Sequence, residues 1–336
     1  MNRWVVPYCF LCAAALTTTF VHAENDASVD KARDALAKQE GDADSAKQLE
    51  EVFQAAEKNY SLLKKGGTSL TYSFDYSYFG DQRLDIEIVN SSVRNLDVTP
   101  SASHTFTNTF SIDYGLLDNV TLSARIPFSS KYDTQSELSN NDLGDVSLSL
   151  RWQPIPYVPG KVSYTVFGSF KTKTGVSPYE INVNRALASG SGYYSASAGL
   201  SASKVLDPVV LFGSTSFSYA FEEDGLNQVR GARLLRSVTP GFSVSFSGGF
   251  SYSLSYDVSM SASFQLSYSD QTELLFQGGD KAVAQDQVSS LVNVSLGTRV
   301  SEKTIINTNF GFGLTEDSPD VLIGVSMPIN IAGLKE

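Results

Sequence analysis

Residues 241–255 read GFSVSFSGGFSYSLS, with Ser or Gly at nearly every second position and Phe, Val, Tyr or Leu between them. Alternation of this kind puts one residue type on each face of a β-strand. The even-numbered residues from Phe242 to Leu254 then form an apolar row, and the serines from Ser243 to Ser253 form a polar one. Gly248 and Gly249 predict a bend or a thin place in the sheet, where other atoms approach the backbone closely.

The same period of two recurs in twelve segments of about nine to fourteen residues between Gly67 and Ile331. Short turns and long polar loops are expected to alternate between them. The expected turns are 116–119, 154–160, 206–208, 255–257 and 301–303, and the expected loops are 80–101, 129–143, 174–190, 222–240, 270–287 and the shorter 315–320. An even number of strands, with mostly long connections at one end only, is typical of outer-membrane barrels.

Soluble β-sandwiches also alternate, so the charge on the apolar face decides between the two classes. That face is almost free of charge in all twelve segments, as a lipid-facing wall requires, because Lys or Arg at the bilayer midplane costs about 2–4 kcal/mol. Aromatic residues also gather near the segment ends, which is typical of interfacial girdles. We therefore predict an all-β fold, a 12-stranded antiparallel transmembrane β-barrel preceded by a short α-helical N-terminal segment.

The chain before the barrel divides into two parts. Residues 1–23 have one basic residue, an apolar run and small residues before Glu24, which predicts a cleavable signal peptide. Residues 24–66 are rich in Ala, Lys, Glu, Asp and Gln and predict a periplasmic helical segment. Residues 67–336 form the predicted barrel. Cys9 and Cys12 both lie in the signal peptide, so the mature chain is expected to have no disulfide.

An apolar seam with spacings of three and four runs along the predicted helix. It comprises Leu49, Phe53, Ala56, Tyr60 and Leu63. Three interpretations remain open: a plug folded into the barrel, a coiled coil with two further copies of the chain, and a loose periplasmic helix. A plug needs apolar contacts inside the barrel, and the few large apolar residues on the polar face are Phe79, Phe167, Leu291 and Ile305.

Charged residues within the predicted strands all fall on the polar, inward face. We expect them to line the lumen: Asp75, Asp113, Arg125, Asp145, Arg151, Lys171 and Arg299. Their mixed sign indicates a weakly selective path through the barrel. The whole chain has a formal net charge of −11, which does not suit nucleic-acid binding.

Catalytic and metal sites have little support in the sequence. After the signal peptide, His104 is the only histidine, and it shares its face with Phe106 and Asn108 rather than with a serine. The acidic loop residues are dispersed and are expected to be solvated. We predict no catalytic residue, no metal site and no cofactor, so the protein is not expected to be an enzyme.

Five stretches resemble a known group of outer-membrane proteins: EKNYSLLKKG (57–66), TSLTYSFDYSYF (68–79), GDVSLSLRWQ (144–153), FKTKTG (170–175) and VLIGVSMPI (321–329). They are similar to the barrel of the functional-amyloid secretion channel and its relatives, which include the transporter-like family of the meta-pathway of phenol degradation. The resemblance implies a 12-stranded barrel and an N-terminal helix that can plug the lumen. In the amyloid channel it also implies a periplasmic trimeric coiled coil.

These observations predict a porin-like channel for transport or secretion across the outer membrane of a Gram-negative cell, with the N-terminal helix as plug or assembly element. Two alternatives are an uptake barrel for hydrophobic or aromatic small molecules, and a non-transporting anchor or adhesin whose outer loops bind a ligand. The expected partners are outer-membrane lipid, the barrel assembly machinery, copies of the chain itself in a trimer, and an exported polypeptide or small-molecule substrate.

Overall fold

The computed structural model describes residues 62–89, 92–158, 160–230, 233–255, 257–301 and 304–329. The predicted signal peptide and the predicted helix up to residue 61 lie outside these residues. Within them the chain forms only strands, turns and bends. The strands are β1 Thr68–Val89, β2 Ser92–Leu117, β3 Val120–Asp133, β4 Leu138–Leu143, β5 Ser147–Trp152, β6 Ser163–Lys171, β7 Ser195–Leu206, β8 Val209–Ala220, β9 Gln228–Arg230, β10 Arg233–Thr239, β11 Ser243–Ser253, β12 Val258–Ser269, β13 Thr272–Phe276, β14 Lys281–Ala284, β15 Gln287–Ser301, β16 Thr304–Gly313 and β17 Val321–Ile329.

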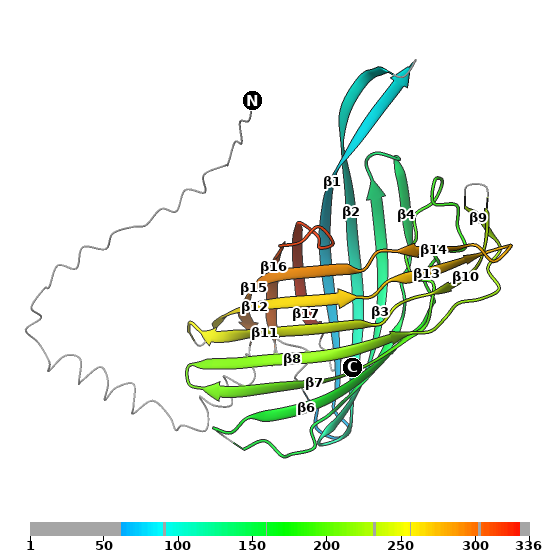
Figure 1. Ribbon diagram of the computed structural model, residues 1–336. Coiled ribbons are helices and arrows are strands. Elements are labelled where there is room, and N and C mark those ends of the chain that lie inside the picture. The colour runs from blue at the N-terminus through cyan, green and yellow to red at the C-terminus, as the bar shows by residue number, and fades with distance from the viewer. Residues whose placement is uncertain are drawn as a thin grey trace, which may run out of the picture. The chain divides into compact units, whose positions relative to one another are not determined.

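The large sheet closes on itself. Its order is β2-β1-β17-β16-β15-β12-β11-β8-β7-β6-β5-β3, and β2 also pairs with β3, which completes a ring of twelve antiparallel strands. Figure 1 shows this ring with β1–β3 on one side and β6, β7, β8, β11, β12, β15 and β16 crossing the other. Closure leaves no unpaired edge in the wall, as the hydrocarbon of a membrane demands. The predicted 12-stranded antiparallel barrel is confirmed.

The wall has an apolar outer face and a polar inner face. In β11, Phe250 is in register with Leu211 and Ala262, while its neighbour Ser251 is in register with Val210 and Ser261. The large apolar side chains of the barrel strands are mostly exposed on the outside, whereas many inward Ser and Thr residues are buried. Barrel curvature crowds small residues on the concave inner face, which is why they are the buried ones.

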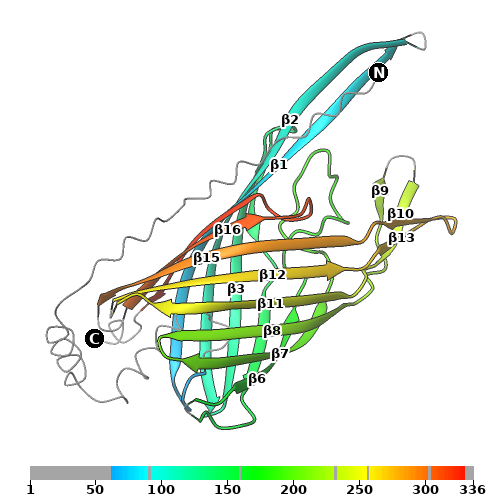
Figure 2. The ribbon, with the colours of Figure 1, turned by 60° about the vertical axis from the view of Figure 1, so that its left-hand side comes forward.

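Two predicted loops are in fact strands. Within the predicted loop 80–101, residues 80–89 continue β1 and residues 92–101 continue β2, and the two pair only with each other beyond the barrel rim (Figure 2). In the predicted loop 129–143, β3 continues to Asp133 and pairs with β4. Polar residues beyond the membrane looked like loops in the sequence, but backbone pairing between strands does not require an apolar face.

The predicted loops 222–240 and 270–287 carry a second, smaller sheet. Its order is β14-β13-β10-β9, and we call it the outer sheet (Figure 1). Its core comprises Leu226, Leu235, Val238 and Phe276, with Tyr179 of the β6–β7 loop packed against it. These are among the most buried apolar side chains of the described residues. No helix in the described part of the chain has the length and hydropathy needed to cross a membrane.

Candidate functional site in the barrel interior

The seven predicted lumen residues lie at three heights on the inner face. Asp113, Arg151 and Arg299 are near the short turns, which face the periplasm in barrels of this class. Asp75 and Arg125 are in the middle of their strands. Asp145 and Lys171 are at the outer end, where β5 begins and β6 ends.

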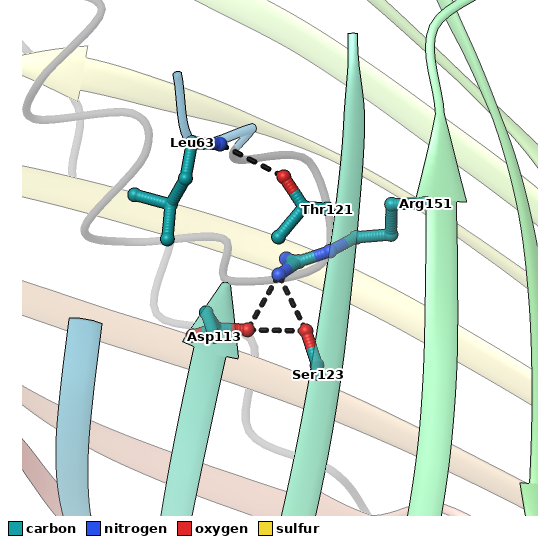
Figure 3. Close-up of polar contacts among 5 residues, drawn as sticks. All are labelled: Leu63, Asp113, Thr121, Ser123 and Arg151. Atoms are coloured by element: carbon teal, nitrogen blue, oxygen red, sulfur yellow. Dashed lines mark hydrogen bonds and ion pairs between the residues drawn. The ribbon is translucent and has the colours of Figure 1, made fainter. Parts of the chain in front are cut away.

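The periplasmic end contains a compact ion pair. A guanidinium nitrogen of Arg151 lies 2.6 Å from an Asp113 carboxylate oxygen and donates to Ser123 Oγ at 2.8 Å. The Ser123 hydroxyl donates to the same carboxylate oxygen, so the three groups form a closed triangle (Figure 3). Arg151 is almost buried. Removing one member of such a pair leaves an uncompensated charge, so the cluster fixes the wall at this height.

The predicted lumen residues in the middle of the barrel are Arg125 and Asp75. The Arg125 side chain is exposed on the inner face and forms no hydrogen bond or ion pair with any residue that the structure describes. Asp75 lies two strands away around the wall, on β1, in register with Gly324 and Thr107. Because the Arg125 side chain is exposed, a solute inside the barrel can reach its charge directly.

At the periplasmic end, the backbone N–H of Arg299 donates to the carbonyl oxygen of Asp257 at 2.8 Å.

At the outer end of the barrel, Asp145 accepts hydrogen bonds from both ends of the β6–β7 loop. Its Oδ1 accepts the Gly175 N–H at 3.0 Å, and its Oδ2 accepts both the N–H and the hydroxyl of Ser191, at 2.7 and 2.6 Å. The two partners belong to the two ends of the β6–β7 loop, residues 172–194. Nearby, the Lys171 ammonium lies 5.3 Å from the centre of the Tyr193 ring. Asp145 is therefore a latch for this loop rather than a free charge in a water-filled path.

The same loop is joined to the outer sheet. Lys173 Nζ donates to Glu223 Oε1 at 2.5 Å, and Arg230 donates to the carbonyl oxygen of Pro178. The hydrogen bond to Glu223 raises the pKa of Lys173. A raised lysine pKa stabilises the folded form throughout the neutral range, and this contribution is lost only as pH rises through the raised pKa. Burial likewise raises the pKa of Tyr179.

Residues 63–67 are hydrogen-bonded to the inner wall, and we call the two wall residues that hold them, Gly115 and Thr121, the seat. The Leu63 N–H donates to Thr121 Oγ1 at 2.9 Å, and this threonine is fully buried. Gly115 exchanges backbone hydrogen bonds with Gly66 and Gly67, at 2.8 and 2.9 Å. A Cβ on Gly115 would lie 2.1 Å from the Lys64 carbonyl oxygen, so only glycine permits this approach.

The seat and the ion pair adjoin each other, because β3 carries both Thr121 and Ser123 (Figure 3). Leu63 is the one predicted seam residue among the described residues. Leu49, Phe53, Ala56 and Tyr60 lie outside them.

Sequence reasoning missed an inward apolar cluster. Val210 and Phe212 face inward on β8 and are 1% and 7% exposed, with Val205 packed against them. Their stretch, VVLFG, is apolar on both faces and so did not reveal an inner side. Of the inward apolar residues that were predicted, Phe79 is exposed at the outer end, whereas Phe167, Leu291 and Ile305 are partly buried.

His104 lies on the outer face of β2 in an aromatic setting. Its Nδ1 is 2.9 Å from the Tyr76 hydroxyl, and the Tyr78 and Tyr132 rings lie beside it. A histidine of this kind belongs to the interfacial girdle.

Comparison with solved structures identifies the fold. No protein-family model matches the chain. The COG4313 outer membrane channel from Pseudomonas putida F1 aligns with a TM-score of 0.60 and 14% identity, over 81% of this chain and 98% of that chain. The translocator domain of autotransporter NalP from Neisseria meningitidis aligns with a TM-score of 0.47 and 10% identity, over 90% and 97%. With its closed ring and apolar outer wall, the chain is a β-barrel protein of the outer membrane.

Proposed function

We propose that the protein is an outer-membrane channel whose lumen is occluded from the periplasmic side by its own N-terminal segment, residues 24–66. The observation that carries this proposal is the hydrogen bond from the Leu63 N–H to Thr121 Oγ1. Because Thr121 holds the Leu63 N–H on the inner wall, the chain that precedes Leu63 starts from the lumen side of β3. A short apolar helix that begins there has the barrel interior within reach.

The inner wall offers what such a plug needs. Val210 and Phe212 form a buried apolar cluster on the inner wall, and an apolar seam can extend this cluster into the lumen. The exposed Arg125 in the middle of the barrel supports a solvated path once the plug moves. We infer a non-enzymatic transport role, with ions or small polar solutes as the simplest cargo and an exported polypeptide as a larger one.

Single-channel recording tests the proposal. We compare the full chain with a variant that lacks residues 24–61, which keeps the seat, and with Thr121→Val, which removes only the hydroxyl acceptor. Thr165→Val is the matched control, because Thr165 is also a buried inward threonine but its hydroxyl does not hold Leu63. We expect several-fold higher mean conductance without the segment, more frequent opening for Thr121→Val, and no change for Thr165→Val.

Two results would contradict the proposal in different ways. If neither the full nor the shortened chain conducts, the protein is not a channel. If both conduct equally, the protein is a channel but the segment is not a plug, and a role in assembly or trimerisation becomes the better explanation.

A second candidate function is an anchor or adhesin, and the outer sheet favours it. A surface loop that only closes a hairpin does not need a buried core of its own, whereas a ligand-binding element benefits from a rigid scaffold. Transfer of residues 222–240 and 270–287 together onto another barrel tests this function. Retained ligand binding by the graft would support it, and a graft that folds without binding would remove it.

A further inference from the structure

One side chain on the lipid-facing wall does not suit hydrocarbon. Asn108 lies on the outer face of β2, between the outward residues Phe106 and Phe110. It is six residues from Tyr114 near the periplasmic end of the strand, which is roughly 15 Å of height for a strand tilted by about 40°. That distance puts its carboxamide near the middle of the apolar band.

Only half of this carboxamide is satisfied. The Tyr72 hydroxyl donates to Asn108 Oδ1 at 2.6 Å. Among the residues that the structure describes, none accepts a hydrogen bond from Asn108 Nδ2. Lipid tails contain no acceptor, and a polar group without a partner at this depth costs several kcal/mol. An acceptor from another molecule must therefore reach the same depth for the group to be satisfied.

The surface around Asn108 is rigid and aromatic. Phe74 of β1 and Phe128 of β3 are in register with Asn108 on either side. Ring centres are 5.4 Å apart for Tyr72 and Phe110, and 6.4 Å apart for Phe110 and Phe128. We call this surface of β1–β3 the aromatic panel. Aromatic rings that already pack against one another lose little conformational freedom on contact, which suits a panel that packs against another protein.

We propose that the aromatic panel is a dimerisation surface, on which a second copy of the chain docks with its Asn108 facing the first. A twofold axis along the membrane normal brings identical residues together at identical depth. A carboxamide is self-complementary because it carries both donors and acceptors, and Oδ1 keeps a second lone pair beside the Tyr72 bond. Each Nδ2 then donates to the other Oδ1, and both amides are satisfied.

Disulfide trapping in native outer membranes tests the geometry. The background is the full chain with Cys9→Ala and Cys12→Ala, which leaves no other cysteine. Asn108→Cys is compared with Thr215→Cys, an exposed outward position on β8, far around the ring from β2. We expect a disulfide-linked dimer from Asn108→Cys only. No dimer from Asn108→Cys, or equal dimer from both positions, would overturn the proposal.

Sedimentation of the purified protein in detergent tests the role of the amide. We expect Asn108→Leu to weaken dimerisation roughly three- to tenfold, the range for a hydrogen bond within a membrane. Thr308→Val, an outward polar position on β16, is expected to leave dimerisation unchanged. Unaltered dimerisation of Asn108→Leu would overturn the amide pairing, and a chain that is monomeric in both detergent and membranes would overturn the dimer itself.

Discussion

At the scale of single residues, Arg125 is the clearest determinant of what the lumen admits. It is inward and exposed, and it belongs to none of the ion pairs among the described residues. Arg125→Glu changes the local charge by two, and a charge about 5 Å from a solvated path alters an ion's energy by roughly 1 kcal/mol or less. We therefore expect the cation-to-anion permeability ratio to rise by roughly two- to fivefold.

The reversal potential in a salt gradient measures this ratio. Arg125→Lys keeps the charge and is expected to leave the potential unchanged. An identical potential for Arg125→Glu would show that ions do not pass this residue.

Gly248 and Gly249, adjacent in β11, give a matched pair for the inner and outer surfaces of the wall. A Cβ on Gly249 would lie 2.3 Å from the Ala262 carbonyl oxygen, whereas the nearest atom to a Cβ on Gly248 is 3.7 Å away. We expect Gly249→Ala to lower the free energy of unfolding by about 1–3 kcal/mol, as overpacking does, and Gly248→Ala to be nearly neutral. Urea unfolding followed by Trp152 fluorescence compares them, and equal stabilities would contradict the close approach.

At the scale of elements, the latch at Asp145 decides whether the β6–β7 loop stays folded. Asp145→Ala removes three hydrogen bonds to a carboxylate, each contributing about 1.5–3 kcal/mol. We expect trypsin to cleave after the exposed Arg185 of this loop at least roughly tenfold faster, because cleavage follows the population of the open loop. Asp142→Ala is the control, since Asp142 is exposed and forms no such contact, and equal cleavage of both variants would exclude the latch.

The number of strands and the face that each side chain occupies could be predicted from the sequence, because both follow from the alternation of apolar and polar residues along a strand. Strand ends could not, because the ribbon at 80–101 and the extension of β3 are polar segments held by backbone pairing. The outer sheet was also missed, because doublets such as Leu234-Leu235 and Leu274-Leu275 show no alternation.

The contacts of the predicted lumen residues could not be predicted from the sequence. Asp113 and Arg151 are separated by 37 intervening residues and meet only because the register of β2, β3 and β5 brings Ser123 between them. A pairing of that kind depends on the stagger of the strands around the barrel, which a single sequence does not contain. The contact between Leu63 and Thr121 could not be predicted for the same reason.

At the scale of the whole molecule, the barrel and the outer sheet are held by different forces. The barrel is closed by backbone pairing around a ring, whereas the outer sheet has a side-chain core around Val238, which is 0% exposed. The barrel and the outer sheet should therefore unfold independently of each other. Val238→Asp puts a charge into that core, and an unpaired buried charge is among the most destabilising substitutions known.

We expect Val238→Asp to unfold the outer sheet alone. Trypsin should then cut after Arg233 or Arg236, while the barrel keeps its compact, heat-modifiable mobility in gel electrophoresis. Val283→Asp is the matched control on the same sheet, because Val283 is 52% exposed and its aspartate remains in water. If Val238→Asp instead abolishes the compact barrel, the outer sheet is part of the barrel's folding unit, and an independent scaffold for ligand binding loses its physical basis.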